Sequence, residues 1–344
     1  MKTSFTDDTR PKVACLVVCE PEVGAIFEQT VPSELDLARV GSYSKKERLA
    51  LIRDADAIIA GTVGVTREEI EASPNLVAIQ KWGVGVDKID LQAARERGVG
   101  VTITAGANAV PVAEHAILLM LATLRHLPWV DSELRQGRWR KTDMRVINHL
   151  LHGKVVGLVG CGFIGKEIAR RLPAFGVDVI YFDTRRLPAV LEEELGIQFV
   201  ELDHLLRHAD IVNVSVPLTD KTRHMIDSQA LSLMKPSAIL INTSRGGIVN
   251  EDDLSNALAQ GEIGGAGIDV FETEPPDSSS QLFGMRDVVV TPHIGGAAIE
   301  NVANVCKSAY RNLVQIFAGN PLPLEAIVIS SGRVFSDSKE EAGV

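Results

Sequence analysis

The feature that most constrains the fold of this chain is a regular alternation of strand-like and helix-like segments. Short apolar, β-branched runs such as VACLVV (13–18) and ADAIIAG (55–61) are separated by segments rich in helix-forming residues, such as 45–54. Strands that alternate with helices are typical of parallel sheets, because each helix returns the chain to the end of the sheet where the next strand begins. The pattern therefore predicts an α/β fold.

The alternation occurs in two series. The first runs from residue 13 to 104, and the second begins at Lys154 and contains seven strand-like runs, the last of which ends at His293. A chain of 344 residues is also long for a single hydrophobic core. We therefore expect two doubly wound, Rossmann-like domains with parallel sheets and a cleft between them.

The segments outside the two series are less regular. Residues 112–127 form an apolar stretch that predicts a long buried helix, whereas residues 128–152 are charged and predict no clear element. A final helix is expected over 299–317. The tail after Ile329 is polar, and we expect it to be loose.

Composition excludes several kinds of partner. The net charge is −10 and the chain contains no basic run, which argues against a nucleic-acid partner and against an anionic membrane. The longest apolar stretch, 113–124, contains Glu114 and His115 and is too short to span a bilayer. The first residues, MKTSFTDDTRPK, include two acids and lack the apolar segment of a signal peptide. We therefore expect a cytoplasmic protein.

The cysteines predict neither a disulfide framework nor a metal site. Cys15, Cys19, Cys161 and Cys306 have no metal-ligand spacing, so no metal is expected. Cys15 and Cys19 lie in an apolar, strand-like run. We expect both to be buried, reduced thiols, as is usual in the cytosol.

The most informative motif is the glycine turn in KVVGLVGCGFIGKEIARRL (154–172). A strand-like run leads into Gly160, Gly162 and Gly165, and a helix-forming segment follows. In a dinucleotide-binding turn, the first glycine permits the tight turn and the second lets the pyrophosphate approach the backbone. The third lets the helix pack closely on its strand. The unpaired N–H groups of the helix N-terminus then bind the phosphates. A structural glycine turn in a domain without a ligand is the alternative.

An acidic residue follows at the position expected for such a turn. Asp183 ends the next strand-like run, 18 residues beyond Gly165. Its carboxylate would accept hydrogen bonds from the adenosine ribose and repel a 2′-phosphate, which favours NAD over NADP. Arg185 and Arg186 leave NADP open, because arginines just beyond the acid could bind that phosphate.

At this point the sequence resembles the D-isomer-specific 2-hydroxyacid dehydrogenases, a family that includes D-3-phosphoglycerate dehydrogenase. The resemblance covers roughly residues 50–320 and rests on the order of its motifs. These motifs are KWGVGVDKID (81–90), AGANAVPVAEHAI (105–117), GLVGCGFIG (157–165), VPLTDKTRHMI (216–226), MKPSAILINTSRGGIVNEDDL (234–254), GAGIDVFETEPP (265–276) and TPHIGG (291–296).

The resemblance implies an NAD(H)-dependent interconversion of a small D-2-hydroxy acid and its 2-keto acid by hydride transfer at C2. The catalytic residues would be Arg245, Glu274 and His293. The chemistry suits these residue types, because an arginine binds a carboxylate in bidentate fashion and an imidazole exchanges protons near neutral pH. Glu274 would orient His293 and stabilise its charged form. Without the family pattern, a solvated arginine, a capping or core histidine and an exposed loop carboxylate are the alternatives.

The cofactor and substrate residues follow from the same motifs. Val84 and the flanking glycines could offer backbone N–H groups to the substrate carboxylate. Lys81 could add a positive charge, although a surface lysine and an ordinary glycine turn explain the same residues. The predicted substrate-binding residues are Lys81, Gly83, Val84, Gly85 and Arg245. The predicted cofactor-binding residues are Gly160, Gly162, Phe163, Ile164, Gly165, Asp183, Pro217, Thr222, Thr243, Asp269 (as the nicotinamide contact) and Gly295.

The resemblance further implies a discontinuous architecture and a homodimer. Residues 1–108 and 298–344 would form a flavodoxin-like substrate domain, and residues 109–297 would form the NAD-binding Rossmann domain. Family members commonly dimerise through the cofactor domain, and Trp139 lies in a segment similar to their dimer loop, although core packing also explains a tryptophan. Two other functions stay open. One is a dinucleotide-sensing scaffold like the related transcriptional corepressors, and the other is formate or phosphite oxidation. The sequence does not identify the 2-hydroxy acid.

Overall fold

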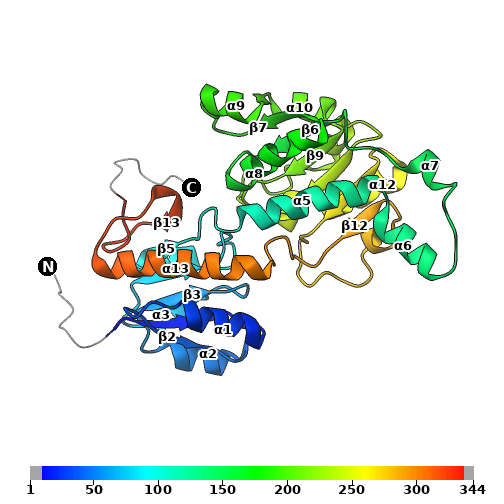
Figure 1. The fold of residues 1–344 in the computed structure, drawn as a ribbon. Helices are drawn as coiled ribbons and strands as arrows, with labels where there is room; N and C mark the ends of the chain where they lie inside the picture. Colours follow the sequence, from blue (N-terminus) through cyan, green and yellow to red (C-terminus); the bar gives the residue numbers. More distant parts are fainter. Residues whose placement is uncertain (1–9, 337–344) are drawn as a thin grey trace. The chain divides into compact units, whose positions relative to one another are not determined.

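The chain forms two compact units in the computed structural model, which describes residues 10–336. Unit 1 comprises Met1–Asn108 and Ala298–Val344, and unit 2 comprises Ala109–Ala297. Each unit is built on its own sheet (Figure 1). The expectations for the first nine residues and for the tail beyond residue 336 lie outside the described residues.

The sheet of unit 1 has the strand order β13-β5-β4-β3-β1-β2. All its pairings are parallel except that of β13 with β5, which is antiparallel, so the predicted parallel sheet is confirmed with one antiparallel edge strand. The strands are β1 (Lys12–Cys15), β2 (Asp36–Arg39), β3 (Ala57–Ala60), β4 (Ala78–Lys81), β5 (Gly100–Thr102) and β13 (Ile327–Ile329). The helices are α1 (Pro21–Thr30), α2 (Lys45–Ile52), α3 (Arg67–Glu71), α4 (Leu91–Arg97), α13 (Ile299–Ala318) and the 3-10 turn η4 (Leu324–Ala326).

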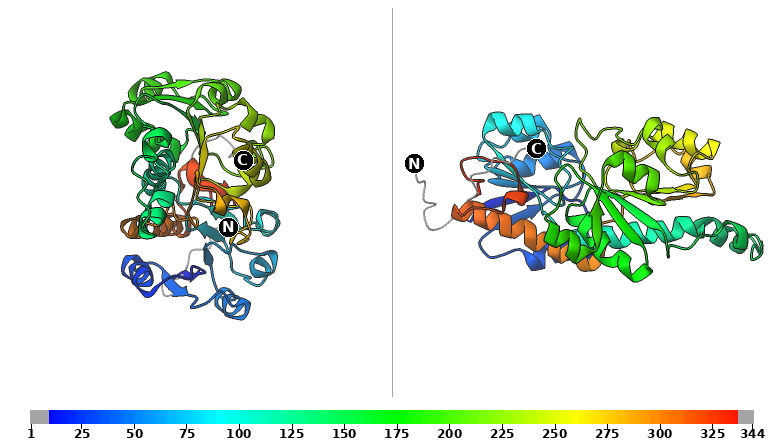
Figure 2. Two further views of the ribbon diagram at one scale, coloured as in Figure 1. Left: turned by 90° about the vertical axis from the view of Figure 1, so that its right-hand side faces the viewer. Right: turned by 90° about the horizontal axis from the view of Figure 1, so that it is seen from above.

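Helix α13 follows unit 2 in the chain but belongs to unit 1, where it packs with the N-terminal segment. It lies beside α1 and the strands of the N-terminal segment, and the views in Figure 1 and Figure 2 agree on this arrangement. The Tyr310 hydroxyl donates to the Phe27 carbonyl (3.0 Å), and the Asn312 amide donates to the Gln80 side chain (3.0 Å). Both contacts are buried, so each satisfies polar groups that burial would otherwise leave unpaired.

The sheet of unit 2 has the strand order β12-β11-β10-β9-β6-β7-β8, and every neighbouring pair is parallel. The strands are β6 (Val155–Val159), β7 (Asp178–Phe182), β8 (Ile197–Phe199), β9 (Ile211–Val214), β10 (Ile239–Asn242), β11 (Gly265–Ile268) and β12 (Val288–Val290). The helices are α5 (Ala109–Leu124), α6 (Leu127–Arg135), α7 (Met144–Ile147), α8 (Phe163–Arg171), α9 (Ala189–Leu195), α10 (Leu202–His208), α11 (Ser228–Leu233) and α12 (Glu251–Gln260), with the 3-10 turns η1 (Leu172–Phe175), η2 (Gly246–Ile248) and η3 (Gln281–Gly284).

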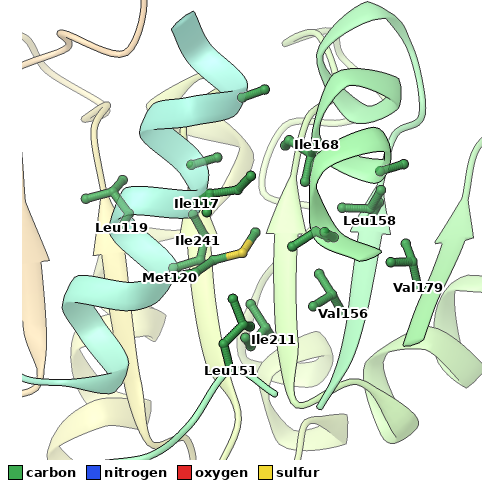
Figure 3. Packing of buried hydrophobic residues seen from close by; sticks show 14 of the residues in the cluster. Ile117, Leu119, Met120, Leu151, Val156, Leu158, Ile168, Val179, Ile211 and Ile241 are labelled. Carbon is green, nitrogen blue, oxygen red and sulfur yellow. The ribbon is translucent and has the colours of Figure 1, made fainter. Parts of the chain in front are cut away.

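Apolar side chains cover both faces of the unit 2 sheet. Alternate strand residues point to opposite faces, so Ile239 and Ile241 of β10 join one core cluster while Leu240 joins the other. Figure 3 shows the first cluster, where Ile117 and Met120 of α5 pack with the strands and with α8. The second cluster packs against α10, α11 and α12. Burial on both faces explains why these strands read as continuous apolar runs.

Several predicted elements differ from the structure. Residues 128–152, expected to lack an element, contain most of α6 and all of α7. Glu133 receives hydrogen bonds from Arg138 and Arg140 there, and such side-chain contacts leave no periodic signal in the sequence. The helix α1 and the strand β2 were not predicted. The tail after Ile329 is not wholly loose, because Val334 is buried and packs where a Cβ on Gly100 would otherwise lie.

Two further expectations concern the thiols and the apolar helix. Cys15 is buried but Cys19 is only half-buried, where its sulfur accepts a hydrogen bond from Arg39 (3.1 Å). Helix α5 is buried along most of its length, as expected. Within residues 10–336, no single helix is long and apolar enough to cross a membrane. The bent pair α5 and α6, which meet at 61°, passes that test only when the two are taken together, by length and composition.

Candidate active site

The candidate active site lies at the carboxyl edge of the unit 2 sheet. Because the strands are parallel, the loops that follow them all leave from this edge, where open α/β sheets bind their ligands. The strand order reverses between β6 and β9, which makes the loop after β6 the switch point of the sheet. The predicted residues that follow these strands are Gly160 after β6, Asp183 after β7, Pro217 after β9, Arg245 after β10, Glu274 after β11 and His293 after β12.

His293 and Glu274 form a hydrogen-bonded pair. The His293 Nδ1 lies 2.9 Å from each carboxylate oxygen of Glu274. Both side chains are partly exposed, and the backbone N–H of Phe271 donates to Glu274 Oε1 (3.3 Å), which fixes the carboxylate. Since Nδ1 is occupied by the carboxylate, Nε2 is the nitrogen that this geometry leaves for a substrate. An imidazole held in this way by a carboxylate can act as a general acid or base.

The loop that carries His293 has an unusual backbone conformation. His293 has a φ of 55°, in the left-handed region that non-glycine residues seldom adopt. Its N–H donates to the Asp269 carbonyl (2.7 Å). The N–H groups of Ile294 and Gly295 donate to the two oxygens of the Asp269 carboxylate, at 2.9 and 2.8 Å. Asp269 therefore holds the loop in place from both its backbone and its side chain.

The Asp269 side chain is almost completely buried. Burial alone raises the pKa of its carboxyl group, but hydrogen bonds from His115, Thr291 and the two loop amides outweigh that effect and lower the pKa below its ordinary value. The Thr291 hydroxyl lies 2.6 Å from Asp269 Oδ1, and His115 Nε2 lies 3.3 Å from the same oxygen. The carboxylate is thus ionised and well paired. A nicotinamide contact at Asp269 stays a prediction.

Arg245 begins the short turn that follows β10. Its NH1 donates to the Ser244 carbonyl (2.6 Å), and the Asn242 side chain donates to the Arg245 carbonyl (2.9 Å). A Cβ on the next residue, Gly246, would lie 1.9 Å from the Phe271 carbonyl carbon, so only glycine fits there. This close approach packs the loop of Arg245 directly on the loop that leads to Glu274.

The glycine turn has the geometry that a dinucleotide requires. Gly160 has a φ of 93°, and a Cβ on Gly165 would lie 2.5 Å from the Gly160 carbonyl oxygen. The backbone conformation and the packing of the turn therefore require glycine at these two positions whether or not a ligand is bound. A Cβ on Gly162 would meet no described atom within 4 Å, and Gly162 caps α8 without a side-chain hydrogen bond. The open space and the uncapped helix N-terminus suit a bound pyrophosphate.

The acid and the arginines after β7 have separate partners. Asp183 accepts hydrogen bonds from the N–H of Cys161 (2.8 Å) and of Arg185 (3.2 Å), which ties the end of β7 to the glycine turn. Arg186 makes a bidentate pair with Glu192, at 2.9 and 2.8 Å. Hydrogen bonds from Arg186 and Tyr181 lower the pKa of Glu192 to about 2. Arg186 therefore pairs with Glu192 and not with Asp183. Of the two arginines that could bind the 2′-phosphate of NADP, only Arg185 then remains as a candidate.

The other predicted cofactor residues lie in loops at the same edge or in α8. Thr222 closes the loop after β9 by donating to the Pro217 carbonyl (2.6 Å), and Phe163 is exposed at the start of α8, where Ile164 follows it. Thr243 is buried, and among the described residues its hydroxyl has no hydrogen-bond partner. A buried hydroxyl without a partner is costly in the protein alone. Thr243 therefore suits a bound ligand that would pair with it.

The predicted substrate residues of unit 1 follow β4, and one of them differs from the prediction. The Gly83 N–H donates to the Thr104 hydroxyl (3.0 Å), so the expectation that this amide is available for a carboxylate is wrong. Among residues 10–336, the amides of Val84 and Gly85 donate to no protein group. The Lys81 ammonium donates to the Gly61 carbonyl (2.6 Å), at the end of the neighbouring strand β3.

Sequence reasoning missed two groups around the site. His115 and Thr291 bind Asp269, although neither was singled out for a role. Glu272 accepts from the Glu251 N–H (3.2 Å), donates its own N–H to the Glu251 carboxylate, and lies 3.1 Å from His224 Nε2. These contacts join residues from distant parts of the chain. The only available signal was that each of these residues lies in a quoted motif.

Comparisons with known proteins identify relatives of this chain. Residues 117–295 match the family described as D-isomer specific 2-hydroxyacid dehydrogenase, NAD binding domain. The chain is 40% identical over 281 residues to the glyoxylate reductase of Thermococcus litoralis, covering 80% of this chain and 84% of that protein. It is 40% identical over 259 residues to the hydroxypyruvate reductase of Thermotoga maritima, covering 74% and 83%.

A solved structure extends the similarity to the fold. The crystal structure of a glyoxylate reductase from Paecilomyes thermophila matches with a TM-score of 0.80 at 29% identity, covering 93% of this chain and 99% of that one. These comparisons do not support the corepressor-like scaffold. Together with the glycine turn and the His293–Glu274 pair, they show that the chain belongs to the D-isomer-specific 2-hydroxyacid dehydrogenases, the NAD-dependent oxidoreductases of 2-hydroxy and 2-keto acids.

Proposed function

We propose that this enzyme reduces a small, unphosphorylated 2-keto acid to the corresponding 2-hydroxy acid. The first candidates are glyoxylate, which gives the achiral glycolate, and hydroxypyruvate, which gives D-glycerate. The observation that carries the proposal is the His293–Glu274 pair at the carboxyl edge of the unit 2 sheet, with hydrogen bonds of 2.9 Å. Relatives that match more than 70% of this chain are named for the reduction of these two acids.

In this proposal, His293 supplies the proton of the reaction. Reduction adds a hydride to C2 and a proton to the C2 oxygen, and NADH supplies the hydride when it is bound. His293 donates its Nε2 proton to that oxygen, and it takes the proton back when the hydroxy acid is oxidised. Glu274, held against Nδ1, fixes the orientation of the ring and stabilises the imidazolium. The pair therefore serves both directions.

The substrate carboxylate requires positive charge and hydrogen-bond donors. Arg245 supplies a guanidinium that binds carboxylates in bidentate fashion and can polarise the neighbouring carbonyl. The amides of Val84 and Gly85 are proposed as further donors, and the ammonium of Lys81 as a further positive charge. Because the chain carries a net charge of −10, these local cations and dipoles determine whether an anionic substrate is attracted.

The cofactor is proposed to bind along the loops after β6, β7, β9 and β10. The amides at the start of α8 would bind the pyrophosphate, and Gly162 leaves the space for it. Asp183 would accept hydrogen bonds from the adenosine ribose. The Thr243 hydroxyl and the loop closed by Thr222 would contact the rest of the dinucleotide.

A homodimer through unit 2 completes the proposal. Helices α5, α6 and α7 and their connections expose apolar side chains, here called the arm surface, which comprises Leu118, Leu127, Leu134, Trp139, Val146 and Leu150. Trp139 is 75% exposed, so core packing does not explain it, and an apolar hollow of about 330 Å³ lies beside α5 and α6. Contiguous exposed apolar surface usually marks an interface. The four free cysteines are consistent with a cytoplasmic setting.

A panel of keto acids assayed through NADH absorbance tests the proposed reaction. Glyoxylate and hydroxypyruvate should give a higher kcat/KM than phosphohydroxypyruvate, because a single carboxylate matches Arg245 and the two amides, whereas the phosphate is a second anionic group. Formate with NAD serves as the control for the alternative chemistry, and it should give no NADH. Preference for the phosphorylated acid, or turnover of formate alone, would contradict the proposal.

Replacement of the proposed acid–base residue tests the mechanism. His293→Gln should lower kcat by about 10²–10⁴, since it removes the proton donor, and should leave the Kd for NADH nearly unchanged. His208→Gln, on the exposed end of α10, is the matched control and should have no effect. In the unsubstituted enzyme, reduction should slow as pH rises and oxidation should slow as pH falls. A near-normal kcat for His293→Gln would remove His293 from the mechanism.

Substitutions at two glycines of the turn distinguish a role in cofactor binding from a role in packing. Gly162→Ala should leave the free energy of unfolding within about 0.5 kcal/mol of the unsubstituted protein, because its Cβ meets no protein atom. It should nevertheless raise the Kd for NADH roughly tenfold or more, about 1.4 kcal/mol. Gly165→Ala should instead lower stability by about 1–3 kcal/mol, because its Cβ collides with the Gly160 carbonyl. Equal effects of the two substitutions on NADH binding at equal stability would contradict this division.

The charge of Asp183 is predicted to set the preference for NADH. Asp183→Asn keeps an acceptor for the Cys161 amide but removes the negative charge. The ratio of kcat/KM for NADPH to that for NADH should then rise roughly tenfold, about 1.4 kcal/mol. Asp178→Asn, at the opposite end of the same strand, is the control and should leave the ratio unchanged. An unsubstituted enzyme that uses NADPH as well as NADH would overturn the assignment.

Charge placed on the arm surface tests the dimer. Leu134→Asp should shift the protein from dimer to monomer in sedimentation velocity, since burying an unpaired carboxylate in an interface is unfavourable. Val190→Asp, at an apolar and still more exposed position on α9, should leave the dimer intact. A monomeric unsubstituted protein, or a Leu134→Asp dimer of unchanged affinity, would exclude this surface.

A further inference from the structure

The hydrogen bonds around Asp269 determine where one proton must lie. Asp269 Oδ1 accepts from the Ile294 N–H, and the Thr291 hydroxyl lies 2.6 Å from the same oxygen. Because the carboxylate is buried, paired with two backbone amides and held at a lowered pKa, it has no proton to give. The single proton of the Thr291 hydroxyl therefore points to Asp269, and the hydroxyl oxygen can only accept from its other neighbour.

That other neighbour is His115 of α5. Its Nε2 lies 2.9 Å from the Thr291 hydroxyl oxygen and 3.3 Å from Asp269 Oδ1. Since both of these oxygens are acceptors toward it, His115 Nε2 must carry a hydrogen. His115 is only about one-tenth exposed, which shields this bond from competition with water.

We infer that His115 is a positioning residue for His293, acting through Thr291 and Asp269. The Nε2–H of His115 fixes the rotor of the Thr291 hydroxyl, and the hydroxyl in turn fixes the carboxylate that binds the Ile294 and Gly295 amides. Those amides immediately follow His293, whose backbone is in the left-handed region. His115 thereby helps to hold the loop in the one conformation that places the His293 ring on Glu274. The inference rests on the proposed role of His293.

Substitutions that keep or remove the donor test this role. His115→Leu removes it, whereas His115→Gln retains an N–H near the position of Nε2. His115→Leu should lower kcat roughly ten- to a hundredfold, as expected when a reacting group is slightly misplaced. KM for the keto acid and the Kd for NADH should change less than threefold, and His115→Gln should restore most of kcat. Glu114→Gln, the exposed neighbour on α5, is the control.

A double-mutant cycle tests the route of the effect. If His115 acts through the Thr291 hydroxyl, His115→Leu combined with Thr291→Val should be no worse than the more damaging single substitution. Fully multiplicative losses would show that the two residues act separately. Equal kcat for His115→Leu and the unsubstituted enzyme, or equal losses for the Leu and Gln variants, would overturn the inference.

A measurement on the unsubstituted protein needs no substrate and uses a variant only to assign the signals. Long-range ¹H–¹⁵N correlation spectra of ¹⁵N-histidine-labelled protein distinguish the two imidazole nitrogens, and the His115 signals are those absent from His115→Gln. Nε2 should be protonated. A neutral ring with a bare Nε2 would overturn the inference even if the proposed reaction were correct. Protonated Nε2 in an enzyme that fails to turn over any keto acid would instead contradict the proposed function alone.

Discussion

The buried carboxylate of Asp269 is the interaction on which the rest of the candidate site depends. Asp269 lies at the end of β11. Its backbone N–H donates to the Asn242 carbonyl of β10, and its side chain binds the loop after β12. The three strand ends that carry Arg245, Glu274 and His293 are therefore connected through one residue. A buried charge is tolerated only when it is well paired, and the pairing here is also what orders the loop.

The remaining geometry follows from parallel strands and close backbone contacts. Parallel pairing brings the loops to one edge, and the contact between Gly246 and the Phe271 carbonyl brings two of them together without an intervening side chain. A similar close backbone contact occurs in the glycine turn, where Gly165 packs on Gly160. Gly162 differs, since nothing in the described protein occupies the space beside it. The edge is thus closely packed where its loops contact one another and open beside Gly162.

Sequence reasoning predicted the features that depend on local pattern. The alternating runs predicted the parallel sheet of unit 2, and the strand, glycines and acid of 154–183 predicted the turn at its switch point. The order of motifs predicted Arg245, Glu274 and His293, and the structure places these residues at one edge with two of them hydrogen-bonded. The approach of loops that are distant in the chain could not be predicted in this way.

What could not be predicted depends on contacts between distant residues. The hydrogen bond from the Gly83 N–H to the Thr104 hydroxyl joins two loops, and no local pattern indicates that this amide already has a partner within the protein. The pairing of Arg186 with Glu192, which holds this arginine away from Asp183, depends on how α9 packs. The contact of His115 with Thr291 spans 176 residues. Helices α6 and α7 were missed because their segment reads as charged and irregular, although Leu127, Val130 and Leu134 recur at helical spacing in α6.

The most direct test of the account follows one hydrogen atom. Hydroxypyruvate should be reduced in ordinary water with NADH that carries deuterium at C4 of the nicotinamide, and the product should be analysed by mass spectrometry and chiral chromatography. The account predicts D-glycerate with one deuterium at C2, because the hydride comes from the cofactor while His293 supplies only the exchangeable proton of the hydroxyl. L-glycerate, or glycerate without deuterium from fully deuterated cofactor, would contradict it.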